Sequence, residues 1–139
     1  MAKRLAVFFL LLGVASIRAQ ERFPSGELEG FRKSATEGTI VHLQKPFVVR
    51  AVNGVIIRSV GDESPVEGAL FELRGPGSSV IIRSATTRSD GKFSLSRVRH
   101  GKYVFKVTAP GFQSVVGIVL VSSRAAAGQI INLSMRPGV

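Results

Sequence analysis

The sequence has 139 residues, and its 19 Lys and Arg residues against nine Asp and Glu residues give a formal net charge of +10 at neutral pH. It contains no Cys, which excludes disulfide bonds, thiolate metal ligands, a thiol nucleophile and the cysteine-linked lipid anchor of bacterial lipoproteins. A chain of this length is expected to form one domain around a single hydrophobic core.

The N-terminus has the three parts of a secretory signal peptide. Basic residues at positions 3 and 4 precede an almost purely apolar run from 5 to 14, and small residues follow up to Ala19. The run is shorter than the roughly 20 apolar residues that a membrane-spanning helix needs. We therefore expect residues 1–19 to be a signal peptide and the protein to be secreted or periplasmic. The mature chain would keep 16 basic and nine acidic side chains, a formal charge of +7.

Residues 20–46 are predicted to be a polar leader that is partly flexible. Phe23 and Phe31 are its candidates for docking on the domain, and 39–43 reads as a short strand. The β-sandwich domain itself is predicted over 47–136.

The first strand region of the domain is 47–59, which Asn53-Gly54 interrupts. Two interpretations are open. Gly54 marks a bulge or a close backbone contact within one strand, or Asn53-Gly54 is a hairpin turn that joins two short strands.

The clearest strand pattern runs from Ala85 to Phe112. Ser89-Asp90-Gly91 is a predicted turn, and strands are predicted at 92–96 and 102–109 because apolar residues alternate with polar ones there. The residues predicted to point inward, in these strands and in the strand predicted at 69–74, are Phe71, Phe93, Tyr103, Phe105, Val107 and Ala109.

Further strands are predicted at 69–74, 80–87, 113–122 and 130–135. The 113–122 strand is apolar on both faces, so we expect it to be covered on both sides. No segment of the mature chain has a helical period. About seven short strands at regular spacing predict an all-β, seven-stranded antiparallel β-sandwich, with two sheets packed around an apolar interior.

Five pieces of the sequence, in this order and spacing, resemble the carboxypeptidase regulatory-like domain: Val52-Asn53-Gly54-Val55-Ile56, Ser64-Pro65-Val66-Glu67-Gly68-Ala69, Thr86-Thr87-Arg88-Ser89-Asp90-Gly91-Lys92-Phe93-Ser94-Leu95, His100-Gly101-Lys102-Tyr103 and Ala109-Pro110-Gly111-Phe112. The resemblance covers roughly residues 50–135. It implies a transthyretin-like, Ig-like Greek-key sandwich of the carbohydrate-binding-like group, in which such domains are usually non-catalytic folding, spacing or binding modules.

The residues themselves give little sign of catalysis. His42 and His100 are far apart, no Ser lies in a Gly-x-Ser-x-Gly elbow, and no phosphate-binding glycine-rich loop is present. Asp62, Glu63 and Glu67 share a loop whose spacing matches no calcium loop, so a solvated loop is the expectation. We predict a non-enzyme without cofactor or metal.

The charge is uneven, because no acidic residue follows Asp90 while seven basic residues do. The plain interpretation is a solvated outer sheet face. The functional one is a ligand surface made of Arg97, Arg99, His100 and Lys102. Phe112, at a turn, is the one aromatic residue of the domain that is a candidate for exposure, although a residue in this pattern more often caps the sandwich core.

The predicted function is an exported, non-catalytic binding or interaction module at the cell envelope, with an acidic glycan or an envelope protein as its partner. Nucleic acid is not expected as a partner, because the chain is exported and no aromatic residues interleave with its basic ones. The alternatives are a transthyretin-like hydrolase that uses His100 and a structural component of an envelope assembly. The oligomeric state is left open.

Overall fold

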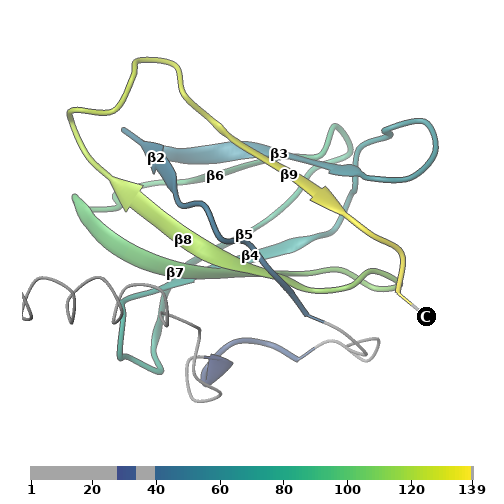
Figure 1. Cartoon of the computed structure of the whole chain (residues 1–139), viewed down its shortest axis with the longest axis horizontal. Coiled ribbons are helices and arrows are strands. Elements are labelled where there is room, and N and C mark those ends of the chain that lie inside the picture. The colour runs from purple at the N-terminus through teal and green to yellow at the C-terminus, as the bar shows by residue number, and fades with distance from the viewer. Residues whose placement is uncertain (1–27, 34–39, 139) are drawn as a thin grey trace, which may run out of the picture.

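The computed structural model describes residues 28–33 and 40–138 (Figure 1). The predicted signal peptide and Phe23 lie outside these ranges. Within them the chain forms nine β-strands and no α-helix: Val41–His42 (β1), Phe47–Val49 (β2), Val52–Arg58 (β3), Leu70–Arg74 (β4), Ile81–Thr86 (β5), Lys92–Leu95 (β6), Gly101–Thr108 (β7), Val115–Val121 (β8) and Ile131–Met135 (β9).

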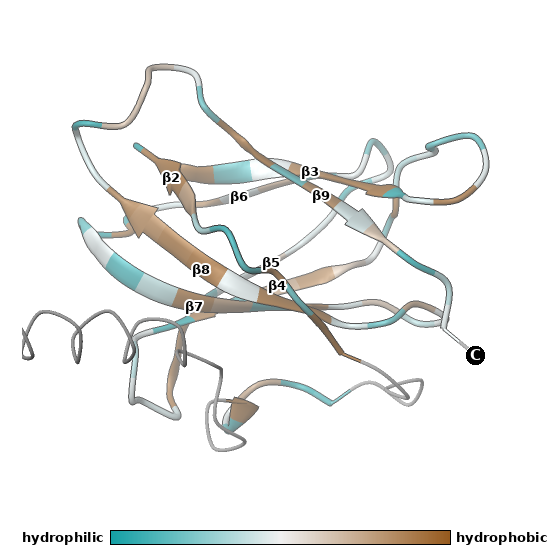
Figure 2. Ribbon diagram, in the orientation of Figure 1, coloured by the Kyte–Doolittle hydropathy of each residue, from teal (hydrophilic) through white to brown (hydrophobic). Residues whose placement is uncertain are grey.

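The strands form two sheets that pack face to face, as Figure 1 shows. The larger sheet has the order β1-β8-β7-β4-β5, with β2 also paired to β8, and the smaller sheet has the order β6-β3-β9. This arrangement confirms the predicted β-sandwich. Hydrophobic residues follow the strands, and β8 is hydrophobic over most of its length (Figure 2).

Strand pairing differs from the antiparallel expectation at the two ends of the chain. The pairs β7–β8, β4–β7, β4–β5 and β3–β6 are antiparallel, whereas β1 and β2 run parallel to β8 and β3 runs parallel to β9. β1 and β2 follow the same edge of β8 and are separated by a segment containing Pro46, which has no N–H to donate to the ladder. These two short strands raise the count from about seven to nine.

Gly54 lies inside an uninterrupted strand, so the hairpin interpretation of Asn53-Gly54 is wrong. A Cβ atom at position 54 would collide with the carbonyl oxygen of Ile131 on β9, which is the close backbone contact of the other interpretation. The break in 47–59 falls instead at Arg50-Ala51, where the chain passes from the larger sheet to the smaller one.

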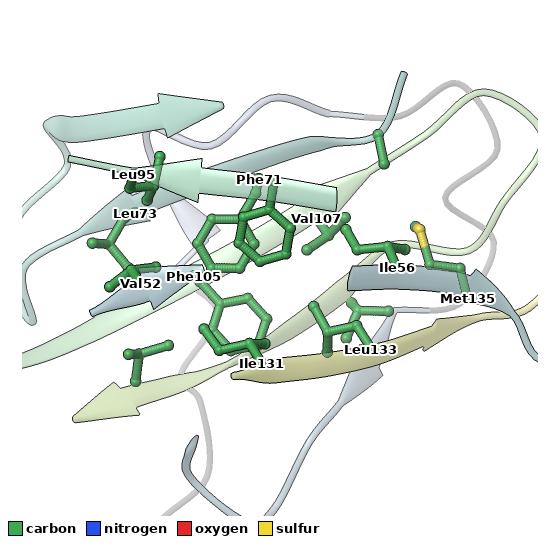
Figure 3. Packing of buried hydrophobic residues seen from close by; sticks show 14 of the residues in the cluster. Val52, Ile56, Phe71, Leu73, Leu95, Phe105, Val107, Ile131, Leu133 and Met135 are labelled. Atoms are coloured by element: carbon green, nitrogen blue, oxygen red, sulfur yellow. The ribbon is translucent and has the colours of Figure 1, made fainter. Parts of the chain in front are cut away.

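Side chains from both sheets meet in one hydrophobic core (Figure 3). The ring of Phe71 stacks on that of Phe93 at 4.5 Å and on that of Phe105 at 5.1 Å between centroids. Ile56, Ile131, Leu133 and Met135 close the core from the smaller sheet. Of the predicted inward residues, Tyr103 is half-buried against the core and the other five are buried, as expected.

The outer face of the larger sheet, the face turned away from the smaller sheet, is also covered. Residues 28–33, which we call the docked segment, lie against it (Figure 1), and Phe31 is buried on Val104 and Val116. β8 is therefore covered on both sides, as predicted. The expectation that Lys106 lies on a solvated face is wrong, because the docked segment covers it and its side chain is buried.

Candidate functional site

Six Arg and Lys residues and His100 gather at one end of the sandwich, where β7 begins and β8 ends (the left of Figure 1). The sheet register brings four connections together there: 50–51, 75–80, 96–100 and 122–130. These connections contain no acidic residue. We call this surface the basic end, and its members, all exposed, are Arg50, Arg83, Arg97, Arg99, His100, Lys102 and Arg124.

The 96–100 loop is held by hydrogen bonds to its backbone. The Tyr103 hydroxyl donates to the Arg99 carbonyl oxygen at 2.7 Å, and Arg83 Nε donates to the Ser96 carbonyl oxygen at 3.3 Å. Arg97 has a φ of 57°, a left-handed conformation that is uncommon for a residue with a Cβ atom. The loop therefore fixes its backbone while the side chains at 97, 99 and 100 stay exposed to solvent.

Arg50 connects this end to the long loop after β8. Its Nε donates to the carbonyl oxygen of Ala125 at 2.6 Å, and the Arg124 amide donates to Ser122 Oγ at 3.1 Å. Arg124 is thus placed at the same end as the 96–100 loop, although the two segments are separated in sequence by β7 and β8.

The acidic loops lie at the other end of the sandwich. Asp62, Glu63, Glu67 and Asp90 belong to the connections that precede β4 and β6. The side chain and amide of Ser64 hydrogen-bond the Asp62 carboxylate and lower its pKa. The acidic loop residues therefore lie at the end opposite the basic end, where Arg58, Arg88 and Lys92 accompany them, and the sequence pattern alone did not reveal this placement.

Of the five residues predicted as a ligand surface, the structure brings four together. Arg97, Arg99, His100 and Lys102 are neighbours in the 96–100 loop and at the start of β7. Phe112 lies in the β7–β8 loop at the opposite end, where it forms a β-bridge with Pro137 and packs half-buried against the core. A stacking surface at Phe112 would therefore be separate from the basic residues.

A groove of about 1050 Å³ opens along the edge of the sandwich between β2 and β9, and we call it the edge groove. Its lining combines three cations with amide, hydroxyl and apolar side chains and includes no acidic residue. Arg124 belongs both to this groove and to the basic end. The polar residues that line it are Gln44, Lys45, Ser59, Arg124, Gln129, Asn132, Ser134 and Arg136.

No three His, Asp or Glu residues among 28–33 and 40–138 lie close enough to share a metal ion. In the same ranges no helix is long and apolar enough to cross a membrane.

Sequence reasoning missed a second group of charged residues on the outer sheet face. Glu72, Arg74 and Lys106 are buried beneath the docked segment and contact its backbone. The available signal was the combination of charged residues at outward strand positions with the apolar outer face of β8, which needed a cover that only the polar leader could supply.

A sequence model of the carboxypeptidase regulatory-like domain matches residues 51–135. None of the curated proteins compared with the sequence matches it. Two crystal structures of type II cohesin–X-dockerin complexes from Acetivibrio cellulolyticus contain chains that are 22% identical to this one. The first is a C-terminal interface mutant, with a TM-score of 0.41 and an alignment that covers 61% of this chain and 56% of that one. The second is an N-terminal interface mutant, with a TM-score of 0.42 and an alignment that covers 63% of this chain and 58% of that one. At these TM-scores the likeness carries no argument about function.

Proposed function

Because the chain belongs to the carboxypeptidase regulatory-like domain family, we propose that it is a non-catalytic binding module, exported from the cell, whose basic end binds acidic glycans. The observation that carries the proposal is the basic end itself. Six exposed Arg and Lys residues and His100, from different parts of the chain, meet there, and the connections that form it contain no acidic residue.

Binding of this kind needs no aromatic platform, because opposite charges attract without one. The 96–100 backbone is already fixed by the bonds from Tyr103 and Arg83, so binding a carboxylate or sulfate has to order the side chains of this loop but not its backbone. The edge groove adjoins this surface at Arg124 and adds amide and hydroxyl groups that suit sugar hydroxyls. A polymer longer than one or two sugar units would contact both.

The test is retention of the chain from residue 20 onward on immobilised acidic and neutral polysaccharides, at low and at physiological salt. We expect retention by the acidic polymers, lost as salt rises, because the screening length falls from about 30 Å at 0.01 M to about 8 Å at 0.15 M. The triple variant Arg97→Glu, Arg99→Glu, Lys102→Glu should lose it.

The matched control places the same three charge reversals at the other end, in Arg58→Glu, Arg88→Glu, Lys92→Glu, all exposed positions. Both triple variants have the same net charge, so a non-specific effect of charge would weaken both equally. Retention by the control variant and not by the first supports the basic end. Equal loss in both, or retention by neutral polymers alone, contradicts the proposal.

A second candidate, contact with an envelope protein, is favoured by the edge strand β5. It has a partner on one side only, β4, within the described sheet, and it exposes Ile82 next to the exposed Val80. Such an edge can accept a strand from a partner. Ile82→Lys should then abolish co-purification of an envelope partner without affecting glycan retention. The hydrolase alternative lacks comparable support, because the loops around His100 contain no carboxylate to orient the imidazole.

A further inference from the structure

The docked segment is held through its main chain. The Arg32 amide donates to Glu72 Oε1 at 2.9 Å, and Lys106 Nζ donates to the Arg32 carbonyl oxygen at 2.8 Å. Glu72 and Lys106 are aligned partners on β4 and β7, so one cross-strand pair binds both backbone groups of a single residue. The Arg74 guanidinium donates to the carbonyl oxygen of Glu29. Contacts of this type accept any side chain at positions 29 and 32.

Two positions of the segment are selective. Phe31 is 6% exposed on a surface formed by Val104 and Val116, and the Arg74 guanidinium lies 4.6 Å from the centre of its ring. Gly30 has a φ of 90°, and a Cβ atom there would collide with the backbone of Ser79. The segment is a turn, in which the Phe31 amide donates to the Leu28 carbonyl oxygen at 3.3 Å, and the face therefore selects a Gly-Phe pair within a turn.

The charged residues beneath the segment are unusual for a face whose only role is to be covered. Glu72, Arg74 and Lys106 are 7%, 1% and 1% exposed. Replacing buried charges with apolar residues of similar size is often neutral or stabilising, so a permanent cover would be served as well by apolar side chains. Charged residues keep the face compatible with water when the segment leaves it, and they bind a peptide backbone when it is covered.

We propose that the outer face of β4 and β7 is a recognition site for a peptide of a partner protein that carries a Gly-Phe pair in a turn, and that residues 29–32 occupy the site in cis until such a peptide displaces them. The site lies on the outer sheet face and is formed by other residues than the basic end, so the proposal stands independently of glycan binding. The docked segment acts as an internal competitor that sets how readily the partner binds.

The experiment uses the full chain and one probe, the blocked hexapeptide Leu-Glu-Gly-Phe-Arg-Lys, which has the sequence of residues 28–33. Binding is measured by NMR from the amide shifts of β4 and β7. In Phe31→Ala the internal segment loses its aromatic anchor and keeps only its main-chain contacts, so it should occupy the site less of the time. We expect the wild-type chain to bind the peptide at least tenfold more weakly than Phe31→Ala, because a site that is nine-tenths occupied in cis raises the apparent Kd tenfold.

Two controls test the contacts. A hexapeptide with Ala in place of Phe should not bind, and Lys106→Met in the Phe31→Ala background should weaken binding about tenfold or more, because it removes a charged donor and keeps an apolar stem. Absence of peptide binding to a folded Phe31→Ala chain, equal binding to both chains, or an unaffected Lys106→Met variant would overturn the proposal.

If Phe31→Ala does not fold, a protease site inserted between Lys33 and Ile40 of the wild-type sequence keeps the proposal testable. After cleavage, the released segment should exchange with labelled hexapeptide while the amide spectrum of the sandwich stays dispersed. A cleaved chain that never exchanges its segment, or that unfolds as the segment leaves, would show that the segment is a fixed part of the core.

Discussion

The contact between Gly117 and Phe105 gives a quantitative test of the core. The two residues are aligned on β8 and β7, and a Cβ atom at position 117 would lie 2.7 Å from two ring carbons of Phe105. Overpacking of this kind costs about 1–3 kcal/mol. Alanine also restricts the unfolded chain more than glycine, which offsets about 0.4–1 kcal/mol. Gly117→Ala should therefore destabilise the protein by up to about 2.6 kcal/mol, and by about 1.3 kcal/mol at the midpoints of the two ranges.

The same substitution should be harmless when the ring is absent. In a Phe105→Leu background the clashing ring carbons are gone, so Gly117→Ala should be neutral or stabilise the protein by up to about 1 kcal/mol. The coupling between the two sites would then be about 1–3 kcal/mol. Urea unfolding of the four proteins measures it from the transition midpoints, provided that their m-values agree. An equal effect of Gly117→Ala in both backgrounds would refute the reasoning, because the ring would not be what requires glycine.

Three other substitutions test local features. Gly91→Val should prevent folding or lower stability by several kcal/mol, because φ is 76° and a Cβ atom would lie 2.6 Å from the Ile56 carbonyl oxygen; a cooperative melt near the wild-type temperature would contradict this. Thr87→Val should lower the free energy of unfolding, measured in urea, by about 1–3 kcal/mol, because it leaves the buried Ala69 amide without its acceptor at 2.8 Å. Thr87→Ser, which keeps the hydroxyl, should retain most of the wild-type stability. Arg97→Gly should be about 0.5–1 kcal/mol more stable than Arg97→Ala by relief of the left-handed conformation, while both elute from acidic glycan at the same reduced salt; equal stability would argue against backbone strain.

Period-two patterns predicted the long strands well, because alternation reports directly on burial. The strands that include Phe93, Phe105 and Val107 were placed from that signal, and each of these residues is buried as predicted. The short strands were harder, since two or three residues carry no period. β1 was expected within 39–43, and it lies there. The break between β2 and β3 at Arg50-Ala51 was not predicted, because it arises where the chain passes from one sheet to the other.

The surface was less predictable than the core, because its features depend on topology. Arg50, Arg124 and the 96–100 loop are far apart in sequence, so their proximity could not be predicted from it. The pairing of β2 and β7 with β8 brings them to one end of the sandwich. Lys106 was expected in solvent because polar and apolar residues alternate along its strand and Lys106 is at a polar position. Its burial arises from the docked segment, which has no period of its own.

The parallel pairing of β3 with β9 has a consequence for the order of folding. Gly54 aligns with Ile131 and Arg58 with Met135, so one of the first strands of the domain pairs with its last. The smaller sheet can form only its β3–β6 half until the final segment of the chain is available. Pairings between strands so distant in sequence lose much chain entropy before they gain contacts, and they slow folding. The pairings of β1 and β2 with β8 are as distant in sequence. We therefore expect the antiparallel β5-β4-β7-β8 part of the larger sheet to assemble first and the closure of the core over Ile56 to be the late, rate-limiting step.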